Sequence, residues 1–400
     1  MSMNNTPAAN RVHIGIFGKR NAGKSSLINA ITAQDLAIVS EQAGTTTDPV
    51  SKSMEILPIG PVVLIDTPGL DDIGELGEKR VKKSYDVLNK TDIALLVVEY
   101  PQELDAEDKA LLEKLKEKKI PYLIVRNKAD LFENEENSLS ENEFIVSAKT
   151  GLQIQELKEH MAKLLPQKKE KPLVRDLVNK GDMVLLVVPI DSAAPKGRLI
   201  LPQQQVIRDL LDGGMITMVV KDKELKETVE KFSKQIKLVV TDSQAFGFVN
   251  KTIPKEMPLT SFSILFARYK GSLASALKGI RAIENLQESD KVLVCEGCTH
   301  HRQCDDIGTV KIPKWLSEYT KKNLQLLFSS GTGFPEDLQE YSLIIHCGSC
   351  MLNEKEVQHR VQRAEQADVP MTNYGLFIAY VNGILKRSLE PFAGQAEFML

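Results

Sequence analysis

The chain has 400 residues, which is enough for two or three domains of about 150 residues each and excludes a single small domain. Hydrophobic residues make up 42% and charged residues 26%, so a fibrous or wholly disordered chain is also excluded. The 51 Lys and Arg residues against 54 Asp and Glu give a formal net charge of -3, which provides no overall basic field for nucleic acid or a membrane surface.

Two features of the sequence indicate the cellular compartment. No apolar run approaches the ~20 residues that span a bilayer, and the start, MSMNNTPAANR, lacks the apolar stretch of a signal peptide. We therefore expect a cytoplasmic protein without membrane contact. All five cysteines lie between Cys295 and Cys350, and an odd number in a reducing compartment favours a metal site over a disulfide framework.

The first part of the chain alternates short apolar runs with helix-length segments. The apolar runs fall within residues 11–18, 61–69, 91–99, 120–130 and 143–151. This alternation predicts an α/β domain with a parallel sheet covered on both faces. The segment LPQKKEKP, residues 165–172, holds two prolines and four charges and is typical of a linker. We therefore place the first domain at residues 1–168.

Two further α/β units follow. Residues 169–258 contain apolar runs at 183–190, 215–220 and 237–241 but no phosphate-binding or metal-spaced residues, so we expect a small dimerisation domain that pairs through an edge strand. In residues 259–400, KVLVCEGC and SLIIHCGSC each run from a strand into a cysteine turn. Parallel strands deliver such turns to one edge of a sheet, which predicts a single cysteine site in a cluster-binding domain.

Residues 18–25, GKRNAGKS, lie between a predicted strand and a predicted helix and match G-x-x-x-x-G-K-[ST]. In such a P-loop, Gly18 and Gly23 let backbone N–H groups wrap phosphates, and Lys24 places a cation on the β- and γ-phosphates. Ser25 is the expected Mg²⁺ ligand. We add the neighbouring Ser26 to the nucleotide-binding residues.

Two further motifs complete the expected catalytic groups. Asp66 and Gly69 belong to DTPG, which follows an apolar strand and places a carboxylate near Mg²⁺ and a backbone N–H near the γ-phosphate. The intervening GTTTDP offers a second Mg²⁺-binding hydroxyl, for which we choose Thr46, with Thr45 or Thr47 as the alternative. We assign Lys24, Thr46, Asp66 and Gly69 to catalysis.

The base-binding motifs follow the next strands. The Asp130 carboxylate can accept two hydrogen bonds from the N1 and N2 edge of guanine, a donor pair that adenine lacks. The order of these motifs at strand ends predicts a GTPase that binds GTP. The residues of the two base-binding segments are Asn127, Lys128, Asp130, Ser147, Ala148 and Lys149.

On these motifs, the first 165 residues resemble the Era/TrmE-like branch of GTPases. Leu70 stands where Ras-like proteins carry a catalytic Gln, so no side chain there can orient the attacking water. Asn21 and the segment AIVSEQAGTTTD resemble the TrmE-type arrangement, in which a potassium ion takes the place of an arginine finger. The resemblance implies slow hydrolysis that potassium stimulates through Asn21.

The cysteine motifs are Cys298-Thr299-His300 and His346-Cys347-Gly348-Ser349-Cys350. Spacing alone leaves two interpretations open. Cys295 and Cys298 with Cys347 and Cys350 would form a Cys₄ zinc site. Alternatively, three of these thiolates with a weaker group would hold an iron–sulfur cluster.

The pattern C-x-H followed about 45 residues later by H-C-x-x-C, downstream of a TrmE-like domain, resembles the HydF family of FeFe-hydrogenase maturation proteins. The resemblance implies a 4Fe–4S cluster on Cys298, Cys347 and Cys350, with the fourth iron weakly held or open. Cys295 and Cys304 are then spare thiols. The candidate fourth ligands are His300, His346, Asp305 and Asp306.

The resemblance also implies a function. It suggests a GTPase scaffold and carrier that holds a diiron subcluster precursor, built with two radical-SAM maturases, and passes it to apo FeFe-hydrogenase. GTP hydrolysis would time partner exchange, and the chain would form a homodimer that binds no nucleic acid. The alternatives are an RNA-associated GTPase with a zinc module and an assembly factor whose zinc only folds the last domain.

Overall fold

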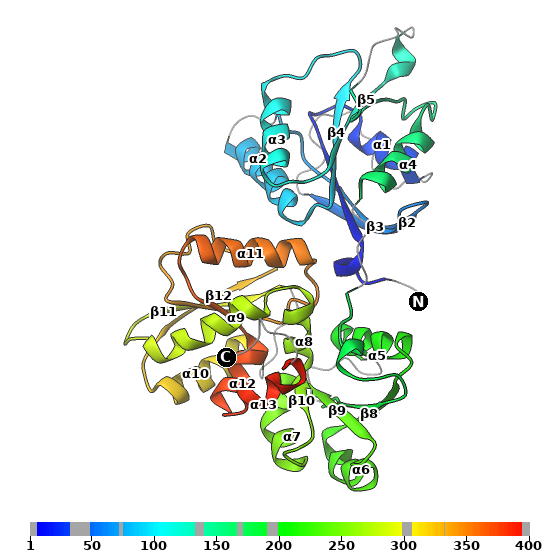
Figure 1. The fold of residues 1–400 in the computed structure, drawn as a ribbon. Coiled ribbons are helices and arrows are strands. Elements are labelled where there is room, and N and C mark those ends of the chain that lie inside the picture. Colours follow the sequence, from blue (N-terminus) through cyan, green and yellow to red (C-terminus); the bar gives the residue numbers. More distant parts are fainter. Residues whose placement is uncertain are drawn as a thin grey trace. The chain divides into compact units, whose positions relative to one another are not determined.

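The structure is a computed structural model that describes residues 6–32, 49–71, 75–132, 140–165, 171–189, 199–297, 306–331 and 333–393 (Figure 1). The chain forms two compact units, Met1–Lys168 and Lys169–Leu400. Of the predicted site residues, Thr46, Cys298, His300 and Asp305 lie outside the described residues, as do Thr45, Thr47 and Cys304.

The first unit is built on a six-stranded sheet in the order β2-β3-β1-β4-β5-β6. All neighbours pair in parallel except β2 with β3, which are antiparallel. The predicted α/β fold with a parallel sheet is therefore confirmed, with one antiparallel edge added. The strands are β1 (Val12–Phe17), β2 (Val50–Ile56), β3 (Gly60–Asp66), β4 (Ile93–Glu99), β5 (Tyr122–Asn127) and β6 (Glu143–Ile145).

Helices cover both faces of this sheet. Helices α1 (Lys24–Thr32) and α4 (Ile154–Leu164) share one apolar core with alternate residues of β4, such as Leu95. Helices α2 (Glu75–Val87) and α3 (Ala106–Glu117) share a second core with the residues between them, such as Leu96. Both faces of β4 are therefore buried, which explains its nearly continuous apolar sequence.

The second unit contains two four-stranded parallel sheets, β10-β9-β7-β8 and β12-β11-β13-β14. Figure 1 shows them in green and in yellow to orange. The strands of the first sheet are β7 (Met183–Val187), β8 (Ile216–Val220), β9 (Ile236–Thr241) and β10 (Leu259–Ser261). Those of the second are β11 (Lys291–Glu296), β12 (Gln325–Ser330), β13 (Leu343–His346) and β14 (Met371–Asn373).

One apolar core joins the two sheets of the second unit. It contains Leu186 of the first sheet and Val294 and Ile345 of the second, together with residues of α8 and α12. A separate core lies on the other face of the second sheet and includes residues of α11. The helices are α5 (Leu201–Asp212), α6 (Leu225–Phe232), α7 (Phe246–Thr252), α8 (Phe262–Tyr269), α9 (Leu273–Ile280), α10 (Ile312–Thr320), α11 (Glu354–Gln366), α12 (Tyr374–Val381) and α13 (Leu385–Leu389).

Candidate functional site

The P-loop connects β1 to α1 and has room only for glycine at two positions. A Cβ added at Gly18 would lie 2.2 Å from the Val97 carbonyl oxygen, and one at Gly23 would lie 2.2 Å from Asn127 Nδ2. Both glycines also have positive φ, +138° and +90°. Lys24 Nζ donates to the carbonyl oxygens of Gly18 at 2.9 Å and Lys19 at 2.7 Å, so its cation lies within the loop.

A magnesium ion fits the carboxylate at the end of β3. Ser25 Oγ donates to Asp66 Oδ2 at 3.0 Å, which joins the two predicted Mg²⁺ groups. Asp66 Oδ1 is buried and makes no hydrogen bond to any part of the chain that the structure describes. Burial raises the pKa of Asp66, an effect that the Ser25 hydrogen bond opposes. A buried, unsatisfied carboxylate oxygen beside a hydroxyl is a suitable oxygen donor set for a divalent cation.

The segment after β3 contacts the P-loop through its backbone. Leu70 N–H donates to the Gly18 carbonyl oxygen at 3.3 Å, and the Leu70 side chain is buried in the core. Arg20 N–H donates to Asp71 Oδ1 at 2.8 Å. A Cβ at Gly69 would lie 2.5 Å from Arg20 Cγ, so the two segments approach closely. Leu70 is therefore packed away from any water that would attack the γ-phosphate.

Three of the nucleotide motifs meet at Asn127. Its Nδ2 donates to the Ala22 carbonyl oxygen at 3.2 Å, and its Oδ1 accepts from Ala148 N–H at 3.0 Å. The side chain therefore ties the P-loop to the segment that follows β6. Lys128 has a positive φ of 69° and its Nζ contacts Glu99 Oε2 at 2.9 Å.

The carboxylate predicted to bind guanine is held by the same segment. Ser147 Oγ donates to Asp130 Oδ1 at 2.6 Å, and Lys149 Nζ lies 3.8 Å from Asp130 Oδ2. The Ser147 hydrogen bond holds the pKa of Asp130 below its ordinary value. Asn21 is an exposed P-loop residue with φ 59°. The structure therefore gathers the described nucleotide motifs at the carboxyl ends of β1, β3 and β5 and after β6.

The two cysteine turns follow neighbouring parallel strands, β11 and β13. Cys347 N–H donates to the Cys295 carbonyl oxygen at 2.8 Å, which extends the strand pairing by one residue. Cys347 Sγ accepts from Gly297 N–H at 3.1 Å and Ser349 N–H at 3.4 Å. Burial raises the pKa of Cys347, whereas these two N–H groups lower it. N–H groups aimed at a cysteine sulfur are a feature of iron–sulfur sites, so the described half of the turn fits a cluster.

Cys295 does not belong to this turn. Its side chain is fully buried in the apolar core that contains Leu293 and Ile344, and Ser329 Oγ donates to its Sγ at 3.2 Å. Burial raises the pKa of this thiol to about 12. A thiol that stays protonated in a core is a poor metal ligand, which argues against the Cys₄ zinc set.

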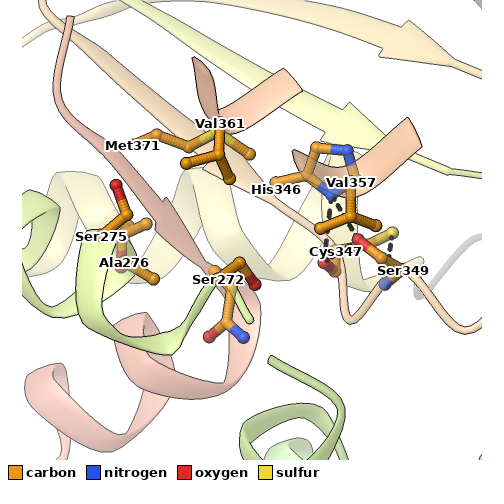
Figure 2. A pocket seen from close by; sticks show the side chains of 11 residues that line it. Ser272, Ser275, Ala276, His346, Cys347, Ser349, Val357, Val361 and Met371 are labelled. Carbon is orange, nitrogen blue, oxygen red and sulfur yellow. Dashed lines mark hydrogen bonds between the residues drawn. The ribbon is translucent and has the colours of Figure 1, made fainter. Parts of the chain in front are cut away.

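His346 lies beside the turn with both ring nitrogens in contact with other groups. Arg360 Nη1 donates to His346 Nε2 at 3.0 Å, and His346 Nδ1 lies 3.1 Å from the Cys347 carbonyl oxygen and 3.1 Å from Ser349 Oγ (Figure 2). A guanidinium only donates, so Nε2 is the acceptor and Nδ1 carries the proton. Burial, and then the Arg360 charge, lowers the pKa of His346 to about 3.

Asp306 and Arg360 have structural roles that their sequence positions do not reveal. Asp306 Oδ2 accepts from both N–H and Oγ1 of Thr309 at 2.8 Å, which caps the turn Ile307–Lys311. Arg360 is 1% exposed and donates to Glu356 Oε1 at 2.8 Å and to the Gly331 carbonyl oxygen at 2.8 Å. Sequence reasoning missed Arg360, because its partners come from three separate segments.

Buried polar residues near the turn were also missed. Glu296, at the end of β11, is 5% exposed, and Tyr374, at the start of α12, is 6% exposed. Lys270 is 1% exposed and its Nζ donates to the Leu352 carbonyl oxygen just after the turn. The position of Glu296 between two cysteines was the one signal available in the sequence. Within the described ranges, no three His, Cys, Asp or Glu side chains are grouped to hold a metal ion, and no helix is long and apolar enough to cross a membrane.

Family models match three successive parts of the chain. Residues 13–128 match the 50S ribosome-binding GTPase model. Residues 173–271 match the hydrogen maturase F dimerization domain, and residues 274–391 match the hydrogen maturase F tetramerization domain. The predicted HydF-like organisation, with a GTPase domain followed by two family-specific domains, is therefore confirmed.

Curated relatives match the first part of the chain. The tRNA modification GTPase MnmE of Lactobacillus helveticus is 43% identical over 126 residues, which are 30% of this chain and 26% of that protein. The MnmE of Aquifex aeolicus is 37% identical over 155 residues, 38% of this chain and 34% of that protein. The chain thus spans only about a quarter to a third of the length of these relatives.

Solved structures with a similar fold include Aquifex aeolicus Era bound to GDP and AlF4⁻. It is 21% identical with a TM-score of 0.36, and the match covers 56% of this chain and 99% of that one. An NFeoB mutant of S. thermophilus bound to GMPPNP is 21% identical with a TM-score of 0.32, covering 40% of this chain and 64% of that one.

Proposed function

Since the chain has the GTPase, dimerization and tetramerization domains of hydrogen maturase F, we propose that it is a GTPase scaffold and carrier for metallocluster assembly. In this proposal the last domain holds a 4Fe–4S cluster and the chain carries a diiron subcluster precursor to apo FeFe-hydrogenase. The partners are radical-SAM maturases and the apo-hydrogenase. The observation that carries the proposal is the pair of N–H groups aimed at Cys347 Sγ within a family-specific domain.

The nucleotide part of the proposal assigns roles to the gathered motifs. Lys24 binds the phosphates, Ser25 and Asp66 bind Mg²⁺ with Thr46, and Asp130 binds the guanine edge. Hydrolysis is slow because Leu70 is buried and offers no group to orient water. We propose that a potassium ion at Asn21 offsets charge on the γ-phosphate and stimulates the reaction.

The cluster part assigns Cys298, Cys347 and Cys350 as ligands. Cys298 follows Gly297 directly in the sequence, and Gly297 N–H donates to Cys347 Sγ. When bound, a 4Fe–4S cluster with three cysteine ligands supplies one iron whose remaining position can exchange. The N–H groups of Gly297 and Ser349 stabilise negative charge on the Cys347 sulfur, which favours its thiolate form.

Anaerobic reconstitution of the full chain with iron and sulfide tests the proposal. We expect about four irons per chain together with the visible absorption and the reduced-state EPR signal of a 4Fe–4S cluster. Cys347→Ala should lose the cluster, and Cys295→Ala is the matched control that should keep it. A protein that binds one zinc tightly and takes up no iron would refute the carrier proposal in favour of a structural zinc module.

A further inference from the structure

The strand register places Glu296 beside Cys347. β11 and β13 pair Val294 with Ile345 and Cys295 with His346. The hydrogen bonds from Cys347 N–H to the Cys295 carbonyl oxygen and from Gly297 N–H to Cys347 Sγ continue the pairing past the last printed register. The next pair along the two segments is therefore Glu296 with Cys347.

Strand alternation separates these two residues from His346. Val294 and Ile345 pack into the core on one face of the sheet, and Ile344 and Cys295 pack into the core on the other. Side chains alternate along a strand, so Glu296 shares the face of Val294, whereas His346 shares the face of Ile344. Cys347 and Cys350 pack against the core on the Val294 face. Glu296 thus shares a face with the two described cysteines, whereas His346 lies on the other face and accepts a hydrogen bond from Arg360.

Tyr374 completes a polar group on the same face. A Cβ added at Gly308 would lie 2.4 Å from the Tyr374 hydroxyl oxygen and 2.6 Å from Glu296 Oε1, so both oxygens border one point. The Tyr374 hydroxyl is buried and makes no hydrogen bond in the part of the chain that the structure describes. Glu296 raises the pKa of Cys347, and Cys347 and Glu296 both raise the pKa of Tyr374 after burial, which places the three side chains near one another.

We propose that Glu296 supplies the exchangeable oxygen ligand at the cysteine site, with the Tyr374 hydroxyl donating a hydrogen bond to that carboxylate. The inference rests on the proposed cluster function and adds a ligand to it. A carboxylate is a hard ligand on a soft, thiolate-bound metal, so it is displaced more readily than a fourth cysteine. A hydroxyl that holds the second carboxylate oxygen orients the first, as partners beyond the ligands do at other metal sites.

The ligand can be tested on the reconstituted full chain. Glu296→Gln removes the anionic donor at constant size, and three cysteines remain, so iron content should persist. Its reduced EPR signal should change, and added imidazole should perturb that signal at about a tenfold lower concentration than in wild type. Tyr374→Phe should shift the signal in the same direction by less. His346→Gln keeps an acceptor for Arg360 and should leave the EPR signal unchanged.

Glu284 provides a matched control, since it also accepts a tyrosine hydrogen bond, from Tyr319 at 2.7 Å, but lies on an exposed surface. Glu284→Gln should match wild type in every cluster measurement. The inference is overturned if Glu296→Gln and wild type show the same EPR signal and the same imidazole response. It is also overturned if His346→Gln alone removes a nitrogen coupling from the wild-type pulsed EPR spectrum.

Co²⁺ titration of the metal-free chain separates this inference from the cluster proposal. Cobalt reports thiolate ligands by its charge-transfer absorption and needs no sulfide. Glu296→Gln should weaken Co²⁺ binding by about tenfold or more and shift its visible bands. If wild type binds cobalt but never assembles an iron–sulfur cluster, the proposed function fails while the cobalt result still decides the role of Glu296. Equal cobalt affinity and identical bands in the two proteins reject that role.

Discussion

Ser147 Oγ donates a 2.6 Å hydrogen bond to Asp130 Oδ1, which fixes the carboxylate proposed to bind guanine. The bond joins the segment after β5 to the segment after β6, two parts of the chain that are separate in sequence. It also holds the pKa of Asp130 below its ordinary value, so this carboxylate stays ionised throughout the neutral range. An ionised Asp130 accepts two hydrogen bonds and donates none, which matches the donor pair of guanine.

We expect Asp130→Asn to weaken GTP binding by about tenfold or more, because an amide cannot accept both guanine hydrogen bonds at one edge. Binding of xanthine nucleotides should improve. Ser147→Ala should weaken GTP binding less, since the carboxylate stays in place without its orienting hydroxyl. Isothermal titration with GTP and XTP measures both effects, and Asp212→Asn on the other unit is the control. Equal GTP affinity in wild type and Asp130→Asn contradicts the assignment.

The pH dependence of GTP binding follows from the same shift. A carboxyl group with a lowered pKa keeps its charge as the pH falls, until the pH reaches that lowered value. GTP affinity should therefore be flat from about pH 8 to pH 5. Ser147→Ala releases part of the shift, so its affinity should begin to fall at a higher pH than that of wild type. A wild-type affinity that declines between pH 6 and 5 would show that another group controls binding.

Potassium should stimulate GTP hydrolysis through Asn21. A fixed cation beside the γ-phosphate stabilises charge in the transition state, and the buried Leu70 offers no alternative. The test compares the GTPase rate in KCl and NaCl at matched ionic strength. Asn21→Ala should lower the potassium rate to the sodium rate and leave GTP affinity unchanged. Full potassium stimulation in Asn21→Ala, or none in wild type, removes the proposed role.

The Arg360 side chain should stabilise the second unit in the absence of any metal. Arg360→Met leaves Glu356 without its partner and His346 Nε2 without its donor, which should lower the free energy of unfolding by about 3 kcal/mol. Urea denaturation of the metal-free chain measures the loss. The double variant Arg360→Met with Glu356→Gln should recover part of it, because the buried charge is also removed. A loss below about 0.5 kcal/mol, typical of surface changes, would show that these contacts carry little energy.

Cys295 and Cys347 should respond differently to replacement by alanine. Cys295→Ala should keep the cluster and cost about 1 kcal/mol of stability, as expected for a small buried side chain. Cys347→Ala should lose the cluster while basal GTPase activity persists, because the two sites lie in separate units. Iron content, thermal unfolding and phosphate release report the three quantities. Loss of the cluster in Cys295→Ala would restore the all-cysteine alternative.

Local sequence patterns predicted the nucleotide site well, because its chemistry is encoded in short motifs at strand ends. Gly18 and Gly23 are required by contacts that the motif anticipates, and the α/β fold followed from the spacing of apolar runs. The antiparallel strand β2 was not predicted, since its alternating burial leaves a weaker apolar signal than that of β3.

The surroundings of the cysteine turn could not be read in the same way. The bond from Arg360 to His346 joins a helix to a strand end, and no pattern marks it. Whether a polar residue is buried depends on the packing of the whole unit, so Glu296 and Tyr374 emerge only from the fold. By contrast, the meeting of the two strand ends followed from the form that KVLVCEGC and SLIIHCGSC share.

The central position of β11 and β13 has a consequence for hydrogen exchange. Each of these strands is paired on both sides, so their amides should exchange only when the second unit unfolds globally. The cysteine turns emerge from this protected part of the sheet, and the strands need not open when metal is gained or lost. Emptying and refilling the site should therefore leave the protection of residues 291–296 and 343–346 unchanged, so one folded chain can serve through repeated cycles of loading.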